Sequence, residues 1–155
     1  MTLFNALAVS STGMTSNRLW IDLIANNIAN ANSTSKTGEA YKRKFPIFAE
    51  LLKDVESNMS DDSDMAAVNN TSGEEVESVG AGVQTYEIRT DASPYKLVYN
   101  PSHPHADKDG FVKMPNVEVI KEMVDMIAAN RAYDASVQVA NAAKAMVNKA
   151  LEIGK

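Results

Sequence analysis

The last third of the chain, residues 117–151, contains no proline and no glycine over 35 residues. Apolar residues recur along it with alternating spacings of four and three, the pattern of a helix that packs against another helix along a seam. At 1.5 Å per residue this helix would be roughly 50 Å long. A domain of 155 residues has no core of that length, so the helix needs a partner along its whole seam. The seam positions are Val119, Met123, Met126, Asn130, Tyr133, Val137, Ala140, Lys144, Val147 and Leu151.

Both ends of this helix carry local signals. Asn116, directly after Pro115, is a favourable N-cap residue, and Glu118 and Glu122 follow in the first turns. Gly154 stands just beyond the expected end, where glycine commonly terminates a helix. We therefore predict a helix over residues 117–151.

The N-terminal residues show the same four-three spacing and predict the partner helix over residues 3–28. Within residues 19–28, apolar side chains lie nearly all the way round, with Trp20 and Leu23 outside the seam. One partner helix cannot cover such a surface, so we expect neighbouring molecules to complete its burial. The seam positions are Leu3, Leu7, Ser10, Met14, Asn17, Ile21, Ile24 and Ile28.

The segment between the helices has a different character. Residues 41–52 alternate as a strand that Pro46 confines to an edge or an irregular segment, and residues 47–52 could instead form a short helix. Residues 83–99 predict a hairpin with its turn at 91–94. Residues 54–77 hold eight acidic residues and no basic residue, which predicts a solvated, mobile loop.

The predicted fold is therefore mainly α, with long N- and C-terminal helices packing as a coiled coil and a small irregular β-hairpin segment between them. The expected organisation is an N-terminal assembly helix over 1–34, a middle segment over 35–110 that includes the acidic loop 54–77, and a C-terminal assembly helix over 111–155.

Composition excludes several classes of protein. The chain carries 20 acidic and 15 basic residues, a net charge of −5, which argues against a nucleic-acid binder. Cysteine is absent, so disulfides, thiolate metal sites and cysteine nucleophiles are excluded. There is no apolar run of membrane-spanning length and no basic region before Arg18 that would suit a secretory signal. These rules alone would place the chain in the cytosol.

Candidate chemistry is sparse. His103 and His105 lie close to Asp107, and the cluster has two interpretations, a metal site or a polar turn. The spacing of an EF-hand beginning at His105 fails, because Asn116 occupies the position where a glutamate is required. No nucleophile elbow, phosphate loop or dinucleotide fingerprint occurs. We predict no catalytic residue, no metal, no cofactor and no enzymatic activity.

A family resemblance emerges at the end of the N-terminal helix. The run Ala-Asn-Asn-Ile-Ala-Asn at residues 25–30 resembles the signature of the flagellar rod, hook and hook-associated axial proteins. The C-terminal part is similar to the proximal rod members of that family, over about residues 80–155. The stretches that carry this similarity are Lys-Leu-Val-Tyr-Asn-Pro at 96–101, Asp107, Gly-Phe-Val-Lys-Met-Pro-Asn-Val at 110–117, Glu-Met-Val at 122–124 and Arg-Ala-Tyr at 131–133.

The resemblance implies a structural protein of the bacterial flagellar basal body that serves motility. Such a protein self-assembles through its terminal helices into the torque-transmitting rod around a central export channel. It would be exported by the flagellar type III apparatus without a cleaved signal peptide and would assemble in the periplasm, which replaces the cytosolic placement above. The implied partners are other copies, rod proteins of the FlgB, FlgF and FlgG types, and the FliE-type adaptor between rod and membrane ring.

The implied assembly residues are the seam positions of both helices together with Asn26, Asn27 and Asn30, which can cap the helix end and bond across subunits. The polar seam positions Asn130 and Lys144, with Asn17, have two interpretations: they lie where the seam meets water, or they fix the register between helices.

Two other classes of protein remain as alternatives. One is a soluble, dimeric coiled-coil adaptor or export chaperone in the cytosol, and the other is a small metal-binding or hydrolytic domain that uses His103, His105 and Asp107. Neither explains the all-round apolar residues 19–28 as well as a packed tube does.

Overall fold

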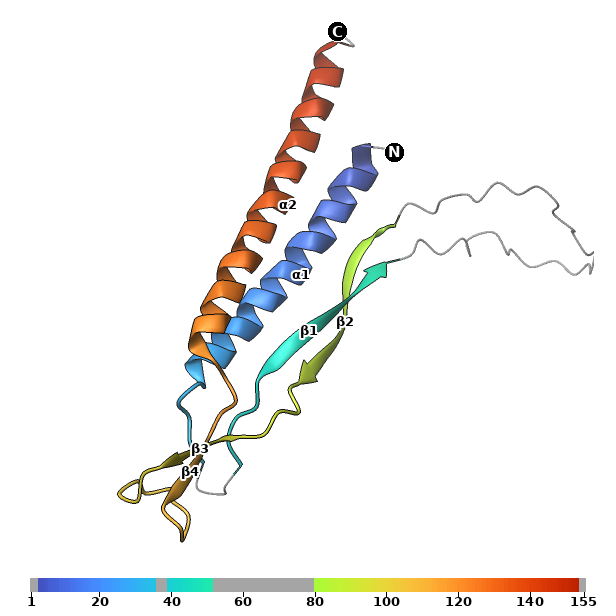
Figure 1. The fold of residues 1–155 in the computed structure, drawn as a ribbon. Coiled ribbons are helices and arrows are strands. Elements are labelled where there is room, and N and C mark those ends of the chain that lie inside the picture. The colour runs from blue at the N-terminus through green and yellow to red at the C-terminus, as the bar shows by residue number, and fades with distance from the viewer. Residues whose placement is uncertain (1–2, 36–38, 52–79, 154–155) are drawn as a thin grey trace, which may run out of the picture.

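The computed structural model describes residues 3–35, 39–51 and 80–153. The predicted acidic loop 54–77 lies outside these residues. Figure 1 shows an elongated molecule with both termini toward one end and the strands β3 and β4 at the other. In chain order the described elements are α1 (Leu3–Ala29), β1 (Lys44–Leu51), β2 (Gly82–Thr90), β3 (Lys96–Tyr99), β4 (Phe111–Met114) and α2 (Val119–Ile153). Two packed terminal helices with small β-hairpin elements between them confirm the predicted fold class.

The two helices lie side by side and run in opposite directions (Figure 1). Their backbones approach closely at Gly13 of α1, where an added Cβ would lie 3.2 Å from Oγ of Ser136 in α2. The buried hydrophobic residues of α2 are small, namely Ala129, Ala140 and Ala143. The distance between packed helices depends on the side chains at the contact. Small residues on α2 therefore allow the close approach, and several larger apolar side chains of α2, such as Ile120 and Val124, are exposed.

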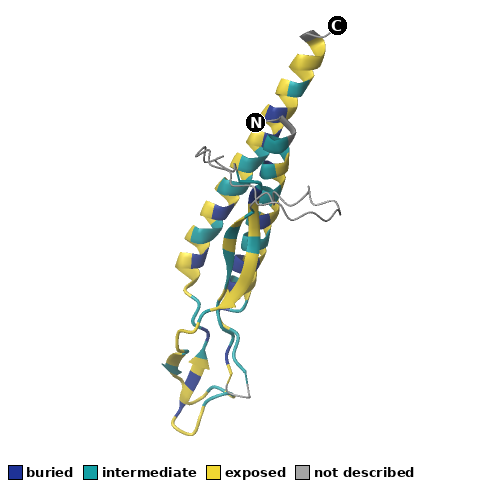
Figure 2. Ribbon diagram, turned by 90° about the vertical axis from the view of Figure 1, so that its right-hand side faces the viewer, coloured by how far each residue is buried: buried dark blue, intermediate teal, exposed yellow. Residues whose placement is uncertain are grey.

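A second face of α1 is covered by the β1–β2 pair, which lies along the helix (Figures 1 and 2). The rings of Trp20 and Phe48 meet edge to face with their centroids 6.1 Å apart, and Leu23 is buried. The expectation that neighbouring molecules must complete the cover is therefore wrong for Leu23, which the chain buries, whereas Trp20 is half-buried within the chain. The sequence pattern indicated correctly that α1 is buried on more than one side.

Hydrogen bonds between the backbone of β2 and side chains of α1 hold the start of β2 against the helix. Val83 N donates a hydrogen bond to Oγ1 of Thr12 at 3.2 Å, and Oγ of Ser16 donates to Val83 O at 3.4 Å. Gly82, which precedes Val83, has φ +132°, and a Cβ added there would collide with Thr12. Glycine is required here because an L side chain rarely adopts this backbone conformation and would find no space.

The predicted hairpin over residues 83–99 is wrong. β1 pairs with β2 in antiparallel register from Lys44 opposite Thr90 to Leu51 opposite Gly82, with a register shift between Ile47 and Phe48. The strand β3 pairs instead with β4. Residues 91–94 lie between β2 and β3, but these two strands do not pair with each other. Instead, Asp91 N donates to Arg43 O at 2.8 Å, which extends the pairing of β2 to the residue before β1.

Asn116 does not cap α2. The helix begins at Val119, and Glu122 N donates to the carbonyl of Glu118 at 3.0 Å. The Asn116 side chain accepts a hydrogen bond from Arg43 N at 2.8 Å and donates to Ser93 O at 3.4 Å. It thereby holds the connection from β4 to α2 against the chain before β1 and after β2.

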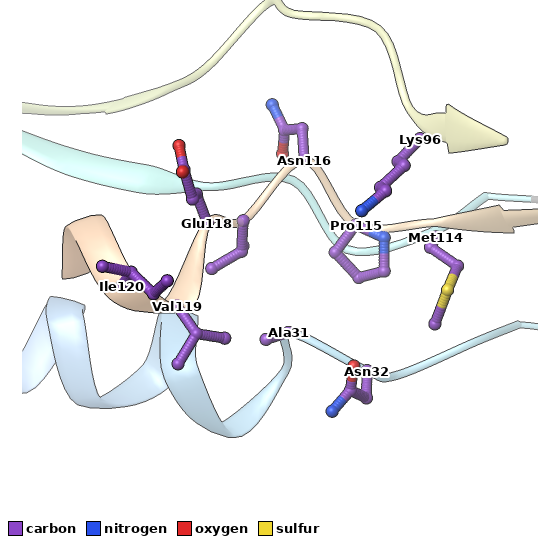
Figure 3. Close-up of a pocket in the computed structure, with 10 residues that line it drawn as sticks. Ala31, Asn32, Lys96, Met114, Pro115, Asn116, Glu118, Val119 and Ile120 are labelled. Atoms are coloured by element: carbon purple, nitrogen blue, oxygen red, sulfur yellow. The ribbon is translucent and has the colours of Figure 1, made fainter. Parts of the chain in front are cut away.

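A groove of about 530 Å³ opens where the chain after α1, the start of β3 and the connection into α2 come together (Figure 3). Ala31 and Asn32 line it from the α1 side, Lys96 from β3, and residues 114–120 from the connection. We refer to it below as the junction groove.

Candidate functional site

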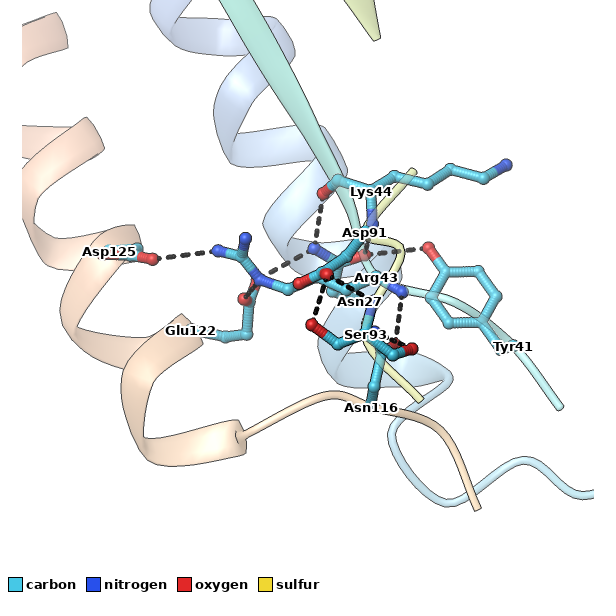
Figure 4. A network of polar contacts seen from close by, with 9 residues as sticks. All are labelled: Asn27, Tyr41, Arg43, Lys44, Asp91, Ser93, Asn116, Glu122 and Asp125. Atoms are coloured by element: carbon cyan, nitrogen blue, oxygen red, sulfur yellow. Dashed lines mark hydrogen bonds and ion pairs between the residues drawn. The ribbon is translucent and has the colours of Figure 1, made fainter. Parts of the chain in front are cut away.

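Asn27, near the end of α1, is the centre of a buried polar network (Figure 4). The residue is only 1% exposed. Its Nδ2 donates to Lys44 O at 2.8 Å and to Oε2 of Glu122 at 2.9 Å. Its Oδ1 accepts from Lys44 N at 3.0 Å and from the hydroxyl of Tyr41 at 2.9 Å. Both amide hydrogens and both acceptor positions are therefore used. One side chain joins α1, β1 and the first turn of α2.

Glu122 is fully buried, and a buried carboxylate is costly unless it is paired and hydrogen-bonded. Here Oε1 accepts from Nε of Arg43 while Oε2 accepts from Asn27. Nη2 of Arg43 also pairs with Oδ2 of Asp125 at 3.3 Å, and its guanidinium lies over the ring of Phe45. A carboxylate in the first turn of a helix is further favoured by the helix dipole. We call Asn27, Tyr41, Arg43, Lys44 and Glu122 the polar junction.

Two titratable groups, one in the polar junction and one beside it, have shifted pKa values. Burial raises the pKa of the Tyr41 hydroxyl, and the negative charge of Glu122 raises it further. The hydroxyl thus stays neutral and donates to Asn27. At the neighbouring turn, the hydrogen bonds from the hydroxyl and the backbone N–H of Ser93 lower the pKa of Asp91.

The polar junction is saturated with internal bonds. Among the described residues, every buried side-chain nitrogen and oxygen has a hydrogen-bond partner. Such a network fixes the register of packed elements, since sliding α1 along α2 would break the hydrogen bond from Asn27 to the buried carboxylate of Glu122. Its role is to hold the two helices and β1 as one unit.

Sequence reasoning singled out Asn27 but missed its partners. Tyr41, Arg43 and Glu122 are ordinary polar residues in their local sequence, and they meet only because α1, β1 and α2 converge. Asn26 and Asn30 serve the helix end, with their Nδ2 atoms donating to the carbonyls of Asp22 and Asn26 at 2.9 Å.

The structure distributes the predicted seam positions unevenly. In α1, Leu3 begins the helix, Ser10 and Ile24 are buried, and Leu7, Met14, Asn17, Ile21 and Ile28 are half-buried. In α2, Ala140 is buried, Met126, Tyr133, Val137 and Val147 are half-buried, and Val119, Met123, Asn130, Lys144 and Leu151 are exposed.

The stripe of α2 that meets α1 is displaced from the predicted seam. Every second position of the observed stripe lies one residue before the predicted seam position. These positions are Glu122, Ala129, Ser136 and Ala143, all buried or half-buried. The apolar pattern of the sequence favoured the larger residues that follow these positions, such as Met123 and Val137. Close packing against Gly13 selects the small ones.

Large apolar side chains consequently face outward from the first turns of α2. We call Ile120, Met123, Val124 and Ile127 the outer face; each is more than half exposed, Ile120 to 75%. Clustered exposed apolar residues of this kind mark interaction surfaces.

The two histidines take part in local bonds. Nδ1 of His103 accepts from His105 N at 3.1 Å, and Nδ1 of His105 lies 2.9 Å from Oγ1 of Thr34. The described ranges contain no group of three side chains placed to hold a metal ion. These bonds fit the polar-turn interpretation and tie this loop to the chain after α1.

Comparison with known proteins defines the class of protein to which these paired terminal helices belong. The family model described as "Flagellar basal body rod FlgEFG protein C-terminal" matches residues 108–153, which include β4 and α2. The class that this model describes is that of the flagellar basal-body rod proteins.

Relatives that align over their full length show to which family of rod proteins the chain belongs. The chain is 43% identical to the flagellar basal-body rod protein FlgC of Borreliella burgdorferi, over 99% of this chain and 98% of the relative. It is 37% identical to FlgC of Bacillus subtilis over all of both chains, and 33% identical to FlgC of Aquifex aeolicus over 100% of this chain and 99% of the relative. The chain belongs to the FlgC family of flagellar basal-body rod proteins.

This membership confirms the resemblance seen in the sequence. FlgC proteins are structural components of the rod and not enzymes, so the chain is a structural rod component. Neither α1 nor α2, nor any other helix among the described residues, is long and apolar enough to cross a membrane.

Proposed function

We propose that this chain polymerises through its terminal helices into the proximal part of the rod, the torque-transmitting drive shaft around the export channel. It reaches the periplasm through the flagellar type III apparatus without losing a signal peptide. Its partners are other copies, rod proteins of the FlgB, FlgF and FlgG types, and the FliE-type adaptor to the membrane ring. The observation that carries the proposal is the outer face of α2.

The outer face supports assembly because it is apolar on a helix whose opposite side already packs on α1. Fully burying a side chain such as Val, Ile or Met stabilises by about 1.5–3 kcal/mol relative to leaving it in water. Four such side chains give a neighbouring subunit a substantial gain, and more exposed apolar residues, Val139, Met146 and Leu151, follow along the helix.

The polar junction supports the mechanical role. A subunit that transmits torque must not let its helices slide, and the hydrogen bond from Asn27 of α1 to the buried Glu122 of α2 opposes that motion. Arg43 pairs with the same carboxylate and ties the chain before β1 to α2. We propose that all the predicted positions serve assembly. Those that α1–α2 packing leaves accessible contact neighbouring subunits, and the buried Ile24, Asn27 and Ala140 hold the fold of the subunit itself. The predicted positions are Leu3, Leu7, Met14, Ile21, Ile24, Ile28, Asn26, Asn27, Asn30, Val119, Met123, Met126, Asn130, Tyr133, Val137, Ala140, Val147 and Leu151.

Gene replacement tests the proposal. In a flagellated bacterium that lacks its own FlgC, we expect this chain to be recovered in purified basal bodies and to restore swimming, while an empty vector does neither. Mass spectrometry of the incorporated chain should find the N-terminal peptide beginning at Met1 or Thr2. Recovery of the chain from the cytosol alone, with rodless basal bodies, would refute the rod assignment. A shortened N-terminus would refute uncleaved export.

A further inference from the structure

The junction groove has an apolar lining with charged residues of both signs. Ala31, Met114, Pro115 and Val117 supply apolar surface, while Lys96 and Glu118 contribute opposite charges (Figure 3). No local sequence pattern marks this groove, since its residues come from three separate segments.

The groove is continuous with the outer face of α2. Ile120 belongs to both, because it lines the groove and is 75% exposed. A helix end inserted in the groove would therefore also touch the face that we assign to assembly.

The opposite end of the molecule carries a helix end without cover from α1. The contacts of Asn27 with Glu122 and of Gly13 with Ser136 fix the register of the helices. In that register, residues 147–153 of α2 extend beyond the start of α1 by about 10 Å, as Figure 1 shows. We call these residues the α2 tip. Leu151 on the tip is 67% exposed.

We propose that the junction groove receives the α2 tip of the next rod subunit. The occupant is the C-terminal end of a rod-type α2, with an exposed apolar residue flanked by one lysine and one glutamate, as in this chain. The inference rests on the proposed function and names the contact that would continue the rod along its axis.

Shape and position favour this occupant. The groove lies where the helix pair meets the β3–β4 hairpin, and the tip lies at the opposite end of the helix pair, so their contact is head-to-tail (Figure 1). A head-to-tail contact joins two different surfaces and repeats without limit when the rotation does not close a ring, which is how helical polymers form.

Charge also favours it. A helix C-terminus carries partial negative charge, and the tip adds Glu152, so Lys96 of the groove faces a complementary end. Lys149, which pairs with Glu152 at 2.8 Å in this chain, is exposed and can exchange that partner for Glu118 of the groove. Exposed pairs of this kind contribute to orientation and specificity more than to affinity.

Site-specific photo-cross-linking in purified basal bodies tests the contact. The photoreactive residue p-benzoylphenylalanine replaces Ile120 in the groove, and in a matched control it replaces Tyr86 on β2, which is 74% exposed. We expect adducts from Ile120 to map by mass spectrometry to the last turns of a rod subunit's C-terminal helix, and adducts from Tyr86 to map elsewhere. Adding Lys96→Glu should lower the yield of the tip adduct by up to about fivefold.

The outcomes separate this contact from the rod assignment. Adducts from Ile120 that map to any other segment, or no adduct from a chain that is present in basal bodies, would overturn the contact and leave the rod assignment standing. If the bulky probe at Ile120 prevents incorporation, a probe at Asn32 on the opposite wall decides between the same results. Absence of the control chain from basal bodies would refute the rod assignment and this contact together.

Discussion

Replacing Asn27 by alanine should lower the free energy of unfolding by about 3 kcal/mol. The substitution removes four hydrogen bonds and leaves the backbone of Lys44, Oε2 of Glu122 and the hydroxyl of Tyr41 without that partner in a buried place. One unsatisfied buried group costs about 1–3 kcal/mol, and more if it is charged. Because a small cavity admits partial relaxation or a water molecule, the total lies well below the sum of four such costs.

Urea unfolding followed by circular dichroism measures this loss, and a thermal melt gives an independent value. For a chain of this size, 1 kcal/mol corresponds to about 2–4 °C, so Asn27→Ala should melt about 6–12 °C below the wild type. Asn27→Asp should be at least as destabilising, because it places a second carboxylate beside Glu122 and removes the amide donors.

Asn26→Ala is the matched control. Asn26 neighbours Asn27, but it is exposed and its side chain donates to Asp22 O of its own helix, so we expect a change within about 0.5 kcal/mol. If Asn27→Ala were as stable as Asn26→Ala, the polar junction would not hold the helices together and the reasoning would be refuted.

Three further predictions concern the same fold. Arg43→Met should cost about 3 kcal/mol in urea unfolding, since Glu122 stays buried without its cation; a loss no greater than that of Asp125→Ala would contradict this. Because the pKa of Tyr41 is raised in the folded protein, Tyr41 contributes stability that is present below its pKa in the unfolded chain, about 10. That stability is lost as the pH rises through its pKa in the folded protein. Unfolding at pH 9 and pH 11 should therefore show a smaller alkaline loss for Tyr41→Phe, and an unchanged loss would refute this. Gly82→Ala should cost about 2 kcal/mol from its φ of +132° and its collision with Thr12; adding Thr12→Ala should recover part of the loss in thermal melts, and no recovery would argue against the collision.

Local signals were enough to predict the helices. The uninterrupted residues 117–151 and the Asn- and Ser-rich residues after Ile28 gave helix bounds within two residues of the observed α1 and α2. These features act through neighbouring residues, so a sequence displays them directly.

Strand pairing and the polar junction could not be predicted in the same way. The partners β1 and β2 are separated by residues 52–81, and no local pattern states which strand pairs with which. The turn at residues 91–94 favoured pairing between neighbours in sequence, and the contact of Asp91 N with Arg43 O shows why that failed. Glu122 looked like an ordinary first-turn acid, because its burial depends on Arg43 and Asn27 from distant segments.

The helix seam shows a further limit of hydrophobic periodicity. The pattern placed Met123 on the contact with α1, whereas the structure places Glu122 there and turns Met123 outward. Periodicity marks a face by its apolar side chains, and a helix that contacts more than one neighbour has more than one such face. Small residues such as Gly13 and Ser136 decide which face packs within the chain.

The most direct test of the account asks whether the outer face of α2 is needed for assembly and not for folding. Val124→Asp with Ile127→Asp adds two negative charges on the outer face, and Gln138→Glu with Asn141→Asp adds the same charge at exposed positions further along the helix. We expect both double variants to melt within about 2 °C of the wild type, as surface substitutions do. Quantitative mass spectrometry of purified basal bodies should then find the control variant at wild-type abundance and the outer-face variant absent. Equal abundance of the two variants would contradict the account.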